Sequence, residues 1–223
     1  MELLPKYSVF GVITPPLGVP GGPKAPTPDV LNRIWSEIGP QYGYRRLELS
    51  ADGTAAQIVG ATDEDGVNIQ PPVLQVLGNI RMTAQQSAEQ AHAILKVITQ
   101  HLGLTQFFNL GIKYIFHAPA PGKDGRAFVL HRLLGKDEVG VNGLQRGADL
   151  WTGVKYVVSD AEGNAFTLLV EPLIADNTFL FLDLDAQFPG LMTLDDLKER
   201  AQDTERYMSQ TVSSYLDGLS AAG

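Results

Sequence analysis

The chain contains no cysteine. Disulfide bonds, thiol catalysis and thiolate metal sites are therefore excluded. Long apolar runs are also missing, because the most apolar stretch, 165–184, is interrupted by Glu171, Pro172, Asp176 and Asn177, and a membrane-spanning helix needs ~18 uninterrupted apolar residues. The first residues do not combine a basic start with an apolar run, so no signal peptide is predicted. These absences lead us to expect a cytoplasmic protein without a membrane segment.

Clustered positive charge is scarce. Lys and Arg number 17 against 25 Asp and Glu, giving a net charge of −8 at pH 7, and Arg45 and Arg46 are the only adjacent basic pair. A phosphate backbone or an anionic lipid surface attracts a protein through clustered cations. We therefore expect neither nucleic acid nor a membrane as a partner. The hydrophobic share of 44% and the charged share of 19% are typical of a folded globular protein.

Local patterns predict helices and strands in mixed order. Thr27 followed by Pro28 is a helix start, and Gly39-Pro40 is expected to end that helix. A capping box at 83–86 opens a second helix, and Thr193 caps a last helix to about Leu219. A short helix is expected at 127–134. An acidic loop is expected at 61–66, and the chain from 135 to 149 is expected to be irregular. The predicted strands are 6–13, 45–50, 55–60, 73–81, 106–117, 151–159, 166–174 and 178–185.

An internal repeat is suggested by the order strand, helix, three strands, helix, which occurs twice. Three pairs of landmarks recur at a nearly constant offset: Lys6-Tyr7 and Lys113-Tyr114, Gly53 and Gly163, and Met82-Thr83 and Met192-Thr193. The sequence thus predicts an α+β fold, a tandem duplication of a βαβββα unit with a mainly antiparallel sheet covered by helices. Residues 1–223 would form one domain of two similar halves, about 1–104 and 105–223. The alternative is an unrepeated α+β domain whose elements happen to alternate.

Two segments of the second half resemble a known family. The strand from Leu110 to Ile115, preceded by a long capped helix, and the strand from Leu180 to Asp185, followed by a long amphipathic helix, are similar to a sporadically distributed bacterial family of uncharacterised proteins. The resemblance covers Tyr7 to Leu219. It implies a fold layout and brings no activity, cofactor or site residue with it.

The candidate catalytic residues are His117, Asp183 and Asp185. The two aspartates lie two positions apart on a predicted strand, so their carboxylates share one face while Leu180, Leu182 and Leu184 share the other. Two such carboxylates could hold a divalent metal, with Glu171 of the preceding strand as a third oxygen ligand, and His117 ends a strand just before a loop. The alternative is a strand with one buried and one solvated face, and no metal is then required.

The usual cofactor and nucleophile motifs are missing. No Gly-x-Ser-x-Gly elbow, phosphate-binding loop or Gly-x-Gly-x-x-Gly turn is present, so no cofactor is expected and an enzyme is disfavoured. The Pro/Gly-rich segment from Thr14 to Pro26 is predicted to be a loop or an exposed arm that can lie over a partner. The alternative is a disordered connection with no role. We therefore expect a non-catalytic protein-binding or assembly module, with a protein partner or a homo-oligomer. The alternatives are a small-ligand binding or sensing protein that uses the cleft between the halves, and a metal-assisted hydrolase.

Overall fold

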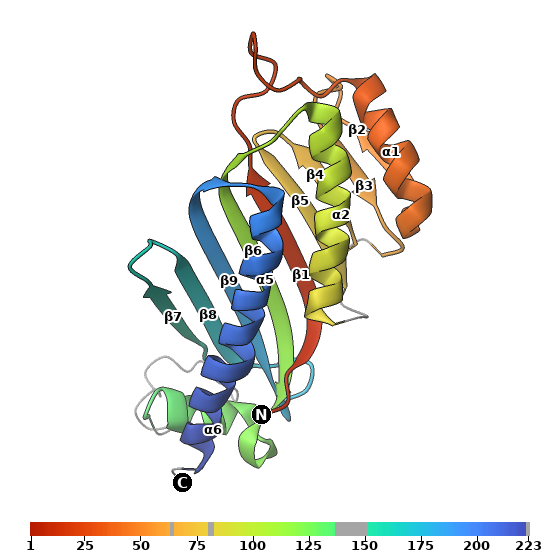
Figure 1. Ribbon diagram of the computed structural model, residues 1–223. Helices are drawn as coiled ribbons and strands as arrows, with labels where there is room; N and C mark the ends of the chain where they lie inside the picture. The colour runs from red at the N-terminus through yellow and green to blue at the C-terminus, as the bar shows by residue number, and fades with distance from the viewer. Residues whose placement is uncertain (63–64, 80–82, 137–150, 222–223) are drawn as a thin grey trace.

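A single antiparallel sheet of nine strands organises the fold in the computed structural model, which describes all residues except 63–64, 80–82, 137–150 and 222–223 (Figure 1). The strand order is β2-β3-β4-β5-β1-β6-β9-β8-β7. The strands are β1 (Leu4–Ile13), β2 (Arg46–Leu49), β3 (Ala56–Val59), β4 (Gly66–Gln70), β5 (Val73–Asn79), β6 (Phe107–Pro119), β7 (Val154–Ser159), β8 (Ala165–Pro172) and β9 (Phe179–Met192). This confirms the predicted mixture of helices with a mainly antiparallel sheet.

The helices cover one face of this sheet (Figure 1). They are α1 (Pro28–Tyr42), α2 (Ala84–Leu102), and a long C-terminal helix made of α5 (Leu194–Arg206), η4 (Tyr207–Val212) and α6 (Ser213–Ala221). Three short helical turns follow β6: η1 (Pro121–Lys123), α3 (Gly125–Ala127) and η2 (Phe128–Leu133). Strand residues alternate between the buried helix side and the opposite side. On β9, Leu180, Leu182 and Leu184 lie on the helix side at 0% exposure. In the described chain, no helix is long and apolar enough to cross a membrane.

The central strands are β1 and β6, which are far apart in sequence. Their antiparallel register places Gly11 opposite Gly111, and each has on its other side a strand from its own half of the chain, β5 beside β1 and β9 beside β6. The core therefore runs without interruption from the first half of the chain to the second. Phe10 and Tyr114 are both almost fully buried in it, and their rings meet edge to face at 5.7 Å.

The first helix is longer than the sequence predicted. It continues through Gly39 and Pro40 and ends at Gly43, whose φ of 70° is the left-handed cap conformation and whose N–H donates to the Gly39 carbonyl. Pro40 is tolerated because its ring fits helical φ, and the missing N–H costs only one hydrogen bond near the end of the helix. A glycine reaches the left-handed conformation without the strain that a Cβ would cause.

The repeat unit also needs correction. β4 occupies Gly66–Gln70, between the predicted acidic loop at 61–66 and the predicted strand at 73–81, where no strand was expected, so the first half has four strands after α1 and not three. The landmark tyrosines do not match either, because Tyr114 is buried on the helix side whereas Tyr7 lies on the other side of the sheet. The predicted irregular stretch at 135–149 lies almost wholly outside the described residues.

Candidate functional site

The three residues singled out by sequence lie on one surface. We call the side of the sheet turned away from the helices the open face. β6 and β9 are neighbours in a register that places Lys113 opposite Asp185, Ile115 opposite Asp183, and His117 opposite Phe181. His117, Asp183 and Asp185 are therefore on the same side of two adjacent strands, and the predicted division of β9 into a carboxylate side and a buried leucine side is confirmed.

Each aspartate already has a protein partner. The Nζ atom of Lys113 lies 2.7 Å from one carboxylate oxygen of Asp183, and Nε2 of Gln187 donates to Asp185 across 2.6 Å. The second oxygen of Asp183, Oδ1, is buried and accepts no hydrogen bond from the described residues. The carboxylates thus belong to a hydrogen-bonded polar row, in which Asn109 also donates to Gln187 across 2.9 Å.

His117 has a different environment from the aspartates. Burial lowers the pKa of its imidazole, and the nearby Lys6 lowers it further. The ring contacts Phe181, with 6.2 Å between the two ring centres. The neutral imidazole is therefore favoured at neutral pH, and no described carboxylate is hydrogen-bonded to it.

A metal centre is not assembled from these groups. Among the residues that the structure describes, no three histidine, aspartate or glutamate side chains are placed to hold one ion. The register explains why Glu171 does not complete a site, since it pairs with Phe181, whereas Leu169 is the residue of β8 opposite Asp183.

A shallow depression marks the middle of the open face, where the two halves of the chain meet. Gly11 of β1 lies directly opposite Gly111 of β6, and their outer neighbours are Gln75 on β5 and Gln187 on β9. The two glycines leave the backbone bare, and the resulting hollow has a volume of about 240 Å³. A Cβ on Gly111 would lie 3.0 Å from Nε2 of Gln187, so a larger residue there would require the end of the glutamine side chain to shift.

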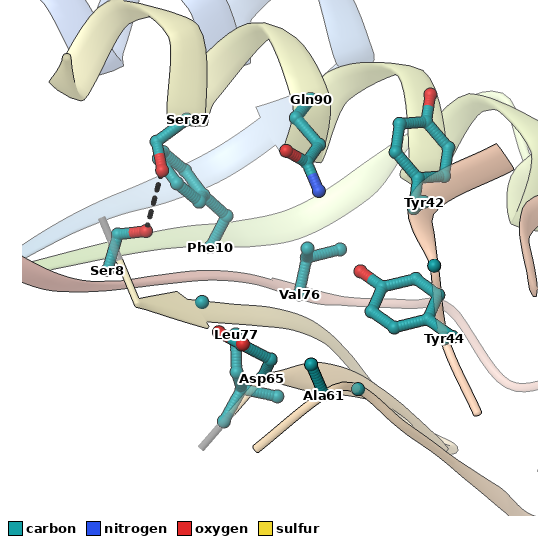
Figure 2. Close-up of a pocket in the computed structure, with 13 residues that line it drawn as sticks. Ser8, Phe10, Tyr42, Tyr44, Ala61, Asp65, Val76, Leu77, Ser87 and Gln90 are labelled. Atoms are coloured by element: carbon teal, nitrogen blue, oxygen red, sulfur yellow. Dashed lines mark hydrogen bonds between the residues drawn. The ribbon is translucent and has the colours of Figure 1, made fainter. Parts of the chain in front are cut away.

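A second cavity lies on the helix side, within the first half of the chain (Figure 2). This helix-side pocket has a volume of about 240 Å³ and is enclosed by β1, β5, α2, the turn after α1 and the loop between β3 and β4. Its lining residues are Ser8, Phe10, Tyr42, Gly43, Tyr44, Gly60, Ala61, Asp65, Val76, Leu77, Gly78, Ser87 and Gln90. This pocket was not predicted from the sequence. The one available indication was Ser8, a polar residue within an otherwise apolar strand segment.

The Pro/Gly-rich segment is tied to the rest of the fold at both ends. The Thr14 N–H donates to the Pro72 carbonyl and the Lys24 N–H donates to the Leu102 carbonyl, each across 2.8 Å. Between them, the Gly18 N–H donates to the Pro23 carbonyl and closes a loop. Of the two predicted forms, loop or arm, the segment is therefore a loop, and its apex, residues 18–22, is exposed.

No protein-family model matches the chain, and no curated protein is similar to it in sequence.

Proposed function

We propose that this protein is a non-catalytic assembly module that binds a second copy of itself through the open face of its sheet. The carrying observation is that partly exposed apolar side chains occupy the middle of that face, while α1, α2 and α5 cover only the other face. These side chains are Val9, Leu77, Ile115, Leu169 and Phe181. Apolar residues gathered on one exposed face are typical of protein interaction sites, and two sheets can pack face to face across ~10 Å.

Charge on the open face favours a second copy over a strongly basic or acidic partner. The chain carries a net charge of −8, yet basic and acidic residues are mixed on the strands of this face, where Lys155 and Glu171 also lie. Lys113 pairs with Asp183, and Arg46 pairs with Glu48 across 2.6 Å. A nearly neutral surface has no excess charge with which to select a partner of opposite sign.

The middle of the face also suits a twofold arrangement. In a symmetric dimer, residues near the axis meet the same residues of the other copy. An axis through the central depression would bring together Gly11, Gly111 and the flanking glutamines, all of them uncharged. Lys113 and Asp183 would lie off the axis, where a lysine of one copy can approach an aspartate of the other.

The test compares Ile115→Lys with Ile174→Lys by light scattering coupled to size exclusion and by sedimentation equilibrium. Ile115 lies in the middle of the open face, whereas Ile174 is 77% exposed in the turn between β8 and β9. We expect a dimer for the wild type and for the Ile174 variant, and a monomer for the Ile115 variant with an unchanged circular dichroism spectrum. A monomeric wild type at all concentrations, or an Ile115 variant that dimerises like the wild type, would refute the proposal.

The tandem duplication is proposed in a revised form, as a five-stranded and a four-stranded half. The order from the centre outward, β1-β5-β4-β3-β2 against β6-β9-β8-β7, supports it, as does a helix that follows each inner partner, α2 after β5 and α5 after β9. A half-length relative that pairs two copies through the strand equivalent to β1 would support a common origin. Half-length relatives that align with only one of the two halves would count against it.

A further inference from the structure

In α2, which forms one wall of the helix-side pocket, the side chains that face the sheet change in size along the helix. The first half of the helix faces the sheet with alanine and serine, whereas the second half does so with Ile94, Leu95, Ile98 and Leu102, all at 0% exposure. Ser87, in the first half, lines the gap above β1 and β5, and its side chain is smaller than those farther along the helix. The helix thus forms one wall of the pocket, and the turn after α1 and the loop between β3 and β4 form others.

Hydrogen-bonding side chains converge on this gap from four elements (Figure 2). The hydroxyl groups of Ser8 and Ser87 lie 3.2 Å apart, and Ser8 is only 2% exposed. The hydroxyl group of Tyr44 and the side-chain amide of Gln90 both point into the gap (Figure 2), and burial raises the pKa of this tyrosine. The tyrosine therefore stays protonated at neutral pH and can donate to, as well as accept from, a bound molecule.

The rest of the lining is apolar or acidic. Phe10 at 1% exposure and Val76 at 5% form the floor, and a carboxylate oxygen of Asp65 at the rim accepts from the Thr62 hydroxyl across 3.1 Å. Among the described residues of the lining, none is basic, so an anion would find no compensating charge.

We propose that the helix-side pocket binds a small uncharged polyhydroxylated molecule, such as a linear polyol. Its volume of about 240 Å³ equals the liquid volume of ~8 water molecules, which suits a ligand of roughly ten non-hydrogen atoms. The serines, Tyr44 and Gln90 both donate and accept hydrogen bonds, as alternating hydroxyl groups require. The apolar floor contacts the carbon chain. An ammonium ion, which only donates, would leave the donors of these neutral groups unused.

The experiment uses saturation-transfer NMR, because polyols raise the melting temperature of most proteins without binding them. Three linear probes with the same number of carbon atoms are compared on the full chain: xylitol, the diamine cadaverine and the dicarboxylate glutarate. We expect a saturation signal for xylitol, a weaker one or none for cadaverine, and none for glutarate. Binding of cadaverine or glutarate in preference to xylitol, or no signal from any probe, would overturn the proposal.

Variants locate the binding in this pocket. Tyr44→Phe keeps the ring and removes one hydrogen bond, so we expect xylitol to bind about tenfold more weakly. Ser87→Val fills part of the gap and is expected to abolish the signal, whereas Ser36→Val makes the same change on the exposed face of α1 and should leave it intact. Xylitol binding that is equal in the wild type and the Tyr44 variant, with both proteins folded by circular dichroism, would contradict the assignment.

Discussion

At the scale of single residues, the titration of His117 on the open face makes the stability of the folded protein depend on pH. Burial, followed by the charge of Lys6, lowers the pKa of His117 in the folded protein, so the unfolded chain takes up this proton first. The resulting stability is fully present above about pH 6.5, the ordinary histidine value, and is lost as the pH falls from there towards the lowered folded value. We expect the free energy of unfolding in urea to decrease between pH 7.5 and pH 5.

Three substitutions separate the sources of this decrease in the free energy of unfolding. His117→Gln should flatten the pH dependence, and His92→Gln should remove another part, because burial also lowers the pKa of His92. Lys6→Met is expected to reduce the slope without removing the imidazole. A His117→Gln variant with the same slope as the wild type would show that this imidazole is not responsible.

Asp183 and Asp185 allow a test of the metal hypothesis. We expect the double asparagine variant to bind Mg²⁺ and Mn²⁺ no more weakly than the wild type in calorimetric titrations, because the wild-type carboxylates already bind Lys113 and Gln187. Asp183→Asn alone should cost about 1 kcal/mol in stability, since it removes the partner of a half-buried lysine, and Asp185→Asn should cost less. Stoichiometric metal binding that disappears in the double variant would revive the hydrolase alternative.

At the scale of elements, the loop between β1 and α1 has a part that is anchored to the core and an apex that is exposed. Leu17 packs against the core, whereas residues 18–22 are exposed. We expect a Gly/Ser replacement of residues 18–22 to leave both the melting temperature and dimerisation unchanged, because the backbone ties at Thr14 and Lys24 remain. Leu17→Ala should lower the melting temperature by several degrees, as loss of a partly buried side chain does.

The loop replacement also tests the sequence-based interpretation of this segment as an arm that lies over a partner. Loss of the dimer on replacing residues 18–22 would place the apex in the interface, contrary to our proposal that the open face alone forms it.

At the scale of the whole molecule, the sequence predicts local patterns such as strand alternation and helix caps, but it does not predict which strands pair in the sheet. The buried leucines of β9 and the cap at Thr83 could be predicted, because alternation and capping are encoded within a few residues. The place of β1 beside β6 could not, since no local pattern specifies which strands pair across a hundred residues. The aspartates were recognised as sharing a face, but their partners Lys113 and Gln187 depend on that pairing.

The helix-side pocket was missed for a related reason. Its lining comes from five separate segments of the chain, and the alanines of α2 fitted the pattern of an ordinary apolar stripe. Only the position of Ser87 relative to Phe10 and Val76 shows that space is left between the helix and the sheet.

The central position of β1 has a consequence for how the chain reaches this fold. β1 can pair with β5 as soon as residues up to Asn79 have been synthesised, but its other edge has to wait for β6, which begins at Phe107. An unpaired strand edge is a template for association with another chain, and pairings between distant segments form slowly. Refolding from denaturant should therefore lose protein to aggregation at high concentration, whereas synthesis on the ribosome keeps the waiting edges of different chains apart.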